Sequence, residues 1–272
     1  MPDFLAGNTK IYYEEHGDKN SPDKIAFLNG VMASVGSWEQ IYPAFVKLGF
    51  HVVLHDFKGQ LRSGKPAGEY TFAEHAEEAR ALFQSLGIER VHLVGTSYGG
   101  EVAMKYAILF PESALSVSII DSVSELDPVL AAFVAGWKYL CELEDGEKFF
   151  KGMAPSIYGP EFMEKNPEFF TDRAKAFRKL PPEYFAGQKI LYDTFVSDVE
   201  MTAELCKIQC PALVLCGGDD ILKKPKFSEI IARNIPNSEY LTIPGSGHVA
   251  ILEKPAELVS AILGFILKNS RR

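Results

Sequence analysis

The 272-residue sequence lacks the features that would assign it to a membrane or to nucleic acid. No segment reaches about 18 uninterrupted apolar residues, the length that a membrane-spanning helix needs. Basic residues are fewer than acidic ones: the chain has 28 Lys and Arg and 36 Asp and Glu, which gives a net charge of -8. The one basic pair at an end, Arg271 and Arg272, is most simply a solvated tail. We therefore expect no membrane and no nucleic acid as a partner.

Cysteine is also scarce. The four cysteines are Cys141, Cys206, Cys210 and Cys216. No two of them form a C-x-x-C pair, and the nearby histidines do not suggest a zinc site. We expect them to be reduced core residues, and we expect no metal and no organic cofactor. Residues 1–8 do not combine a basic region with an apolar stretch, so no signal peptide is expected and the sequence is typical of a cytoplasmic protein.

Apolar and aromatic residues, by contrast, are ample for a packed core, at 47% and 12% of the chain. Short apolar runs alternate with amphipathic patterns, which predicts parallel βαβ units with helices on both faces of one sheet, an α/β fold. Residues 11–15 are expected to form an edge strand. The other expected strands are 24–28, 50–54, 91–94, 115–120, 212–216 and 239–243. The expected helices are 38–48, 72–86, 98–110, 227–234 and 255–268.

The alternation breaks between the strands at 115–120 and 212–216. Residues 125–204 are helical in pattern, rich in Phe, Tyr, Lys and Glu, and interrupted by prolines. We therefore predict a helical cap domain at 125–204, inserted into a core domain made of 1–124 and 205–272. This insertion is expected to cover the carboxyl edge of a mostly parallel sheet.

The most informative motif surrounds Ser97, in the hexapeptide 95–100 of sequence GTSYGG. An apolar strand pattern precedes it and a helical pattern follows. Strand, sharp turn and helix form the context in which G-x-S-x-G places a nucleophilic serine at the carboxyl edge of a sheet. The turn should strain the backbone of Ser97, and a side chain at Gly95 or Gly99 should crowd it.

A serine hydroxyl needs a base, and the base needs an acid to orient it. Of the six histidines, His248 is the best candidate, because it follows the last strand in a glycine-containing loop, 244–248. The acid is expected after another strand end, where Asp219 and Asp220 are candidates and Asp121 is a third.

The sequence also indicates where an oxyanion and a substrate would bind. Backbone N–H groups of Tyr98, directly after the serine, and of Val31, in the loop after the strand at 24–28, are expected to form an oxyanion hole. Gly30, Trp38 and Trp137 are the expected substrate contacts, although aromatic residues more often serve packing. The other aromatic candidates for the lining of an apolar pocket are Tyr139, Phe149, Phe150 and Tyr158.

Together these motifs resemble the α/β-hydrolase superfamily, in its capped branch of lactonases, carboxylesterases and haloperoxidases. The resemblance covers nearly the whole chain and is weakest at 125–204. It rests on 95–100, on 217–220, which is similar to the family's G-x-x-D, on 247–255, which is similar to G-H-x-x-x-L-E-x-P, and on 56–63, in the D-x-x-G-x-G-x-S region. The resemblance implies Asp220, not Asp219, as the acid.

The chain departs from the family pattern in places. Asn29 stands where the family usually has His, and Leu61 replaces a glycine. Dehalogenases and epoxide hydrolases use an aspartate nucleophile, so Ser97 argues against both. Proline iminopeptidases carry an H-G-G-P-G loop and C–C hydrolases a G-P-G-A-like stretch, and the sequence has neither.

The sequence thus predicts a serine hydrolase of a small apolar ester, lactone or thioester, with Ser97, His248 and Asp220 as the triad. Two alternatives stay open: an acyltransferase or perhydrolase that uses the same triad, and a non-catalytic ligand-binding relative.

Overall fold

The computed structural model describes residues 3–269, and the predicted tail pair Arg271 and Arg272 lies outside the described residues. One eight-stranded sheet forms the centre, in the order β1-β2-β4-β3-β5-β6-β7-β8. Strands β1 and β2, and β2 and β4, pair antiparallel, whereas all pairs from β4 to β8 are parallel. The strands are β1 Asp3–Ala6, β2 Thr9–His16, β3 Lys24–Leu28, β4 His51–His55, β5 Val91–Thr96, β6 Ala114–Ile120, β7 Ala212–Gly217 and β8 Ser238–Ile243.

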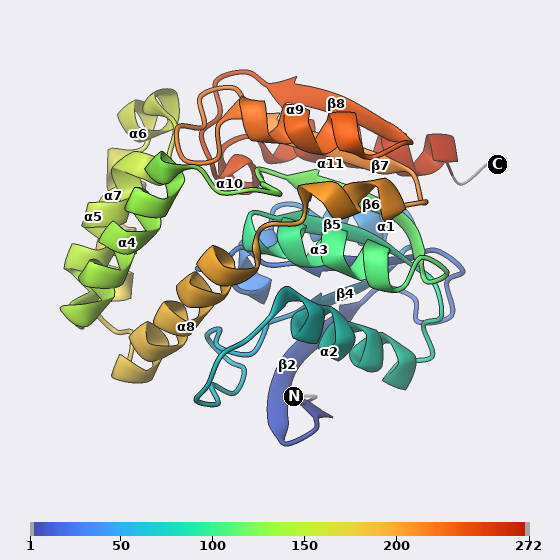
Figure 1. Ribbon diagram of the computed structural model, residues 1–272, viewed down its shortest axis with the longest axis horizontal. Coiled ribbons are helices and arrows are strands. Elements are labelled where there is room, and N and C mark those ends of the chain that lie inside the picture. Colours follow the sequence, from blue (N-terminus) through green and yellow to red (C-terminus); the bar gives the residue numbers. More distant parts are fainter. Residues whose placement is uncertain (1–2, 270–272) are drawn as a thin grey trace.

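Helices cover both faces of this sheet, as the alternation predicts (Figure 1). One face carries α2 Phe72–Ser85, α3 Tyr98–Leu109 and α9 Pro225–Asn234, and the other carries α1 Tyr42–Lys47, α10 Ala250–Glu253 and α11 Pro255–Asn269. Strand side chains alternate between the two resulting cores: Leu93 of β5 lies in the first and Val94 in the second. Strands β4, β5 and β7 are buried along their whole length, which explains their continuous apolar runs.

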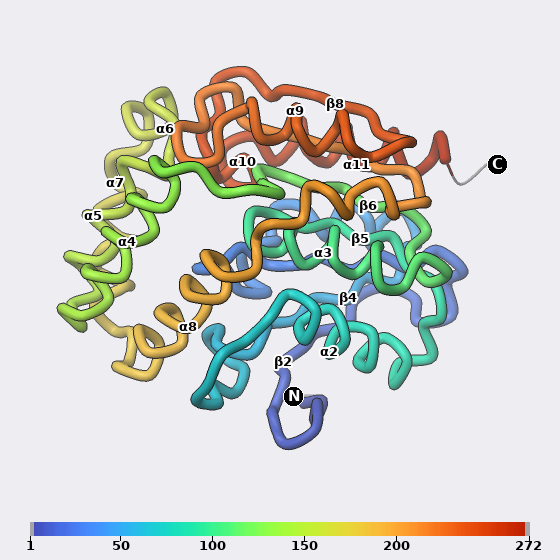
Figure 2. The backbone as a smooth tube through the Cα atoms, viewed as in Figure 1, coloured from blue at the N-terminus to red at the C-terminus, as the bar shows by residue number. Residues whose placement is uncertain are grey.

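Between β6 and β7 the chain leaves the sheet and returns through a helical segment (Figure 2). Its helices are α4 Pro128–Glu142, α5 Gly146–Ile157, α6 Pro160–Lys165, α7 Pro167–Phe177 and α8 Pro182–Asp198, and the short η2 Thr202–Lys207 follows. In Figure 1 these helices gather at one end of the sheet, on the left of the view. Their buried side chains continue the core of the α2–α3 face.

Three details differ from the sequence-based expectations. Residues 11–15, expected to form an edge strand, lie within β2, which is not at the edge because β1 pairs outside it. The expected helix 38–48 is a 3-10 turn, η1 Val35–Trp38, followed by the short α1. Cys206 is exposed, whereas the other three cysteines are buried, and all four are free thiols. No helix among residues 3–269 is long and apolar enough to cross a bilayer.

The core also holds histidines without hydrogen-bond partners. Both ring nitrogens of His55 are buried and unpaired, and the ring meets Phe57 edge-on with centroids 4.9 Å apart. Burial, and secondarily the nearby His75, lowers the pKa of His55 to about 4. His55 is therefore neutral in the folded protein under conditions where it takes up a proton in the unfolded chain.

We expect this histidine to make the fold sensitive to acid. Stability is fully present above the unfolded-state pKa of about 6.5 and is lost as the pH falls from there to about 4, by roughly 3 kcal/mol from His55. Urea unfolding of the wild type and of His55→Phe, at about pH 7 and about pH 4.5, measures this loss of unfolding free energy. His55→Phe should lose less stability on acidification than the wild type, whereas His16→Gln, at a half-exposed site on β2, should match the wild type. Equal losses in His55→Phe and wild type would contradict this assignment.

Candidate active site

Ser97 lies at the junction of β5 and α3, in the turn that the sequence predicts. Its backbone is strained, with φ 52° and ψ -121°. A Cβ atom at Gly95 would lie 2.2 Å from the Gly99 carbonyl oxygen, and one at Gly99 would lie 2.1 Å from the Leu28 carbonyl oxygen. Only glycine fits at either position, so the predicted strain and crowding of this turn are confirmed.

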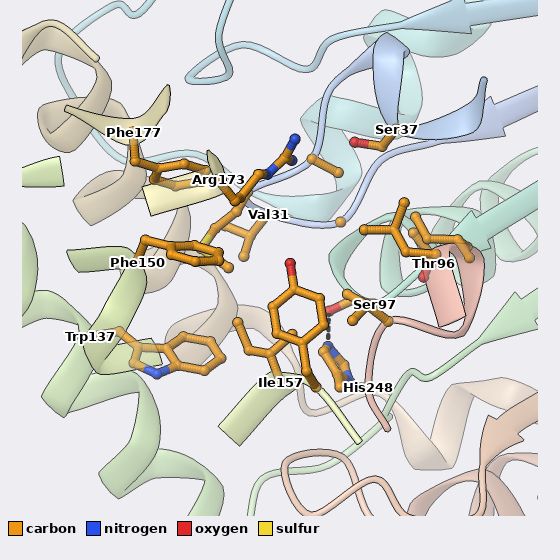
Figure 3. Close-up of a pocket in the computed structure, with 17 residues that line it drawn as sticks. Val31, Ser37, Thr96, Ser97, Trp137, Phe150, Ile157, Arg173, Phe177 and His248 are labelled. Carbon is orange, nitrogen blue, oxygen red and sulfur yellow. Dashed lines mark hydrogen bonds between the residues drawn. The ribbon is translucent and has the colours of Figure 1, made fainter. Parts of the chain in front are cut away.

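The two other predicted triad residues form a chain that starts at Ser97, and Figure 3 shows its first link, between Ser97 and His248. His248 Nε2 lies 3.0 Å from Ser97 Oγ, and His248 Nδ1 lies 2.8 Å from Asp220 Oδ2. A carboxylate only accepts, so Nδ1–H donates to Asp220 and Nε2 is left to accept the serine proton. Asp220 is 2% exposed and its Oδ1 accepts from the backbone N–H groups of Leu222 and Lys223, at 2.8 and 2.9 Å.

The two alternative acids lie elsewhere. Asp219 is exposed, and none of the contacts described for its side chain reaches His248. Asp121 is fully buried with φ 49°, and its carboxylate accepts from the N–H groups of Gly217 at 2.7 Å and Ala250 at 3.3 Å. Burial, and then the adjacent Asp220, raise the pKa of Asp121. Asp121 thus ties the end of β7 to the start of α10, next to the loop that carries His248.

The predicted oxyanion-hole residues face Ser97 from two sides. Tyr98 begins α3, so its N–H has no carbonyl one turn earlier to bond. Val31 follows β3, and no hydrogen bond from its N–H is described among residues 3–269. A Cβ at Gly30 would lie 3.4 Å from the Ser97 Cβ, which shows how closely this loop passes the serine.

A buried polar network holds the Val31 loop in place. Asn29, which stands at the family's usual His position, donates to Asp56 Oδ1 and Gln60 Oε1, each at 3.1 Å. Gln60 donates to the Gly30 carbonyl at 2.8 Å, and Asp56 accepts from the Val35 N–H at 2.8 Å. The sequence analysis did not assign these roles to Asn29 and Gln60, because the partners are about thirty positions apart.

Trp38 belongs to this network and not to the substrate cavity. Its indole N–H donates to Asn29 Oδ1 at 2.8 Å, and its ring is fully buried against Phe27 in the core on the α1–α11 face. The expectation that Trp38 contacts substrate is therefore corrected. Its predicted companions Gly30 and Trp137 do line the cavity beside Ser97.

The cavity opens between the sheet edge and the helical segment (Figure 3). Most of its lining is apolar. The lining residues are Gly30, Val31, Met32, Ala33, Ser37, Thr96, Ser97, Trp137, Phe150, Ile157, Tyr158, Arg173, Phe177, His248, Val249, Ile251 and Leu252. Of the other aromatic candidates, Phe149 is fully buried and Tyr139 is 69% exposed, so neither lines it. A smaller apolar hollow on the other side of Ser97 is bounded by α4, α8 and Lys223.

Two carboxylates fix the loops around the site. Glu101, one turn along α3 from Ser97, is fully buried and pairs with Lys223 Nζ at 2.9 Å, which joins α3 to the loop that carries Asp220. Glu253 accepts from the N–H groups of Gly247 at 2.8 Å and Gly159 at 3.1 Å, which joins the His248 loop to the helical segment. Among residues 3–269, no cluster of three or more His, Cys, Asp or Glu side chains could hold a metal ion.

This geometry can be compared with known proteins. A family profile described as alpha/beta hydrolase fold matches residues 25–255. The chain belongs to the α/β-hydrolase family. The strand order and the helices on both faces agree with that membership, so the predicted fold class is confirmed.

Several proteins similar to this α/β hydrolase are described as hydrolases or as lactone-degrading enzymes. The RutD protein of Pseudomonas syringae pv. syringae (strain B728a), named as a carbamate hydrolase, is 26% identical over 261 residues, covering 94% of this chain and 98% of that protein. The solved structure of MGS-M2, an alpha/beta hydrolase from a Medee basin deep-sea metagenome library, matches with a TM-score of 0.90 at 26% identity, over 97% of this chain and 96% of that chain. Est816, described as an N-acyl homoserine lactone degrading enzyme, matches with a TM-score of 0.81 at 27% identity, over 97% and 100%. The chain is therefore an α/β-hydrolase enzyme.

Proposed function

We propose that this α/β hydrolase is a serine hydrolase of carboxylic esters, lactones or thioesters. One observation carries the proposal: Ser97 Oγ, His248 and Asp220 form a hydrogen-bonded chain, with distances of 3.0 and 2.8 Å, at the wall of an apolar cavity. A nucleophile, a base and an orienting acid in that order are what acyl transfer to water requires.

The reaction would proceed through an acyl-enzyme. Ser97 Oγ attacks the substrate carbonyl carbon while His248 Nε2 takes the hydroxyl proton, and Asp220 stabilises the imidazolium that forms. The N–H groups of Val31 and Tyr98 would bind the negative charge on the carbonyl oxygen. As the tetrahedral intermediate collapses, the bond to the leaving alcohol or thiol breaks and His248 returns the proton to it. Water, deprotonated by His248, then attacks the acyl carbon. As the bond from that carbon to Ser97 Oγ breaks, His248 returns the proton to Oγ and the acid is released.

The helical segment would act as a cap over this site. Trp137 of α4, Phe150 and Ile157 of α5 and Phe177 of α7 supply one apolar wall of the cavity, whereas the loops at the sheet edge supply the other. An enclosed apolar wall suits a small or medium acyl or ring group, with acyl chains of roughly C2 to C8. The lactone-degrading activity stated for Est816 is consistent with this substrate class.

An activity screen combined with covalent labelling tests the proposal. We expect turnover of short-chain p-nitrophenyl esters, lactones or thioesters, falling for chains beyond about C8. A fluorophosphonate should label the protein, and mass spectrometry should place the adduct on Ser97. Labelling should slow strongly in His248→Ala, because the serine then lacks its base.

Three outcomes would contradict the proposal or a part of it. An adduct on another residue, or none, would remove Ser97 as the nucleophile. Labelling of Ser97 without hydrolysis of any ester, lactone or thioester would favour an acyltransferase, a perhydrolase or a ligand-binding protein instead. Strong activation at a lipid–water interface, with preference for long-chain triglycerides, would refute the small enclosed substrate.

A further inference from the structure

Arg173 is the unexpected member of the cavity wall. It lies on α7, and its side chain lines the same cavity as Ser97 and His248 (Figure 3). No Asp or Glu is among the residues that line this cavity. Apart from the catalytic histidine candidate, Arg173 is therefore the one cationic side chain among the residues that line this mostly apolar cavity, and its guanidinium is always charged.

Within residues 3–269 this guanidinium has no hydrogen-bond acceptor and no ion-pair partner. Its Nε is buried without a partner, and its described contact is with the ring of Phe177, where the guanidinium carbon lies 5.6 Å from the ring centroid. The contrast with its neighbour is direct, because Arg178, just beyond the same helix, pairs with Glu147. A buried donor left unpaired costs free energy, so its partner is expected to come from outside the chain.

A second unpaired donor lies in the same cavity. The Tyr158 hydroxyl has no hydrogen-bond partner described among residues 3–269, although the residue lines the cavity and is only 9% exposed. Burial raises the pKa of Tyr158 to about 12, and the positive charge of Arg173 opposes that rise. The hydroxyl is therefore protonated at neutral pH and remains a donor within the electrostatic reach of Arg173. Two donors of this kind match a carboxylate, which offers acceptors only.

We propose that the substrate carries a carboxylate at the end away from its scissile carbonyl, and that Arg173, with the Tyr158 hydroxyl, binds this carboxylate. The inference rests on the proposed ester or lactone hydrolysis and narrows its substrate class to half-esters and carboxyl-bearing lactones or esters. The apolar wall between Arg173 and Ser97 would hold the carbon chain that separates the two functional groups. Charge pairing with a guanidinium that is partly shielded from water strengthens binding and fixes the orientation of the substrate.

Matched pairs of esters test this substrate class. The first pair places the carboxylate in the acyl part: p-nitrophenyl hydrogen glutarate and its neutral methyl ester. The second places it in the alcohol part: 4-(butanoyloxy)benzoate and its methyl ester. In at least one pair we expect wild-type kcat/KM to favour the anionic member. Arg173→Gln should lower that anionic-to-neutral ratio by roughly 10- to 100-fold, mainly through KM, as expected for the loss of a charged hydrogen bond.

Lys175→Gln is the matched control, because it removes the same charge from the same helix at an exposed position that pairs with Asp172. It should leave the ratio unchanged, and Arg173→Lys should retain part of it, since the charge remains while the planar fork is lost. Calorimetry of the same esters with Ser97→Ala measures their binding affinity, and therefore the contact with Arg173, without turnover. A protein that fails to hydrolyse the esters but binds the anionic members through Arg173 would therefore overturn the proposed function and support this contact.

The inference is overturned by any of three results. Arg173→Gln that lowers kcat/KM for both members equally would show that Arg173 only packs on Phe177. Wild type that hydrolyses neutral esters without any preference for the anionic member would reject the carboxylate while keeping the esterase. Calorimetry with no binding of either anionic ester to Ser97→Ala would reject the site directly.

Discussion

Replacement of Ser97 with alanine is expected to lower kcat for ester hydrolysis by at least about 10⁴-fold, because the acyl-enzyme route is lost with the nucleophile. The residual rate would come from oxyanion stabilisation and substrate binding alone. The hydroxyl has one described side-chain contact, with His248 at 3.0 Å, and alanine tolerates the φ of 52° no worse than serine does. The fold should therefore survive the change.

Steady-state kinetics with p-nitrophenyl butyrate, alongside thermal unfolding of both proteins, measures this expectation. Ser37→Ala is the matched control. Ser37 also lines the cavity, but its hydroxyl accepts from the Ser34 N–H and has no described contact with His248, so its loss should stay under about 10-fold. Hydrolysis above a few percent of wild type in pure, folded Ser97→Ala would show that another group is the nucleophile.

Much of the fold can be predicted because its signals are local. Runs such as 91–94 and 212–216 are buried on both faces, so they are continuously apolar and bounded by turns. The helical character of 125–204 follows from its pattern in the same way. The edge strand Asp3–Ala6 escaped prediction because it is short and half exposed, and alternation over four residues is too weak a signal.

The residues of the site likewise fall into those with a local sequence signal and those placed by tertiary packing alone. Ser97 and His248 each follow a strand end, beside glycines whose positions leave no room for a side chain, and the Val31 loop also follows a strand end. Such spacing can be read from the sequence. Contacts that arise only from tertiary packing cannot be read from the sequence. Trp38 is an aromatic residue of the kind that often contacts substrate. Its indole N–H instead donates to Asn29, and its ring packs in the core on the α1–α11 face of the sheet. Arg173 lies among other charged residues of α7, and only the fold distinguishes it as the one that faces the cavity.

Among the adjacent carboxylates at the end of β7, replacement of Asp220 with asparagine should reduce kcat on the order of 10³-fold or more, whereas Asp219→Asn should cost under about 10-fold. The reason is geometric. Asp220 Oδ2 accepts from His248 Nδ1 at 2.8 Å, whereas Asp219 is exposed and its own N–H bonds the Ser246 carbonyl. An asparagine at 220 can donate from its NH₂ to His248 Nδ1, which favours the tautomer with the proton on Nε2. A protonated Nε2 cannot accept the proton of Ser97.

The measurement is kcat for the two single variants on one ester, with thermal unfolding to show that both fold. Asp219→Asn is the matched control, since it makes the same chemical change one residue away. The opposite ranking would make Asp219 the acid. Near-wild-type activity in both would pass the role to Asp121, whose carboxylate lies beside Asp220 but is already engaged by the N–H groups of Gly217 and Ala250. Because Asp121 has no described contact with His248, we expect the loss to fall on Asp220.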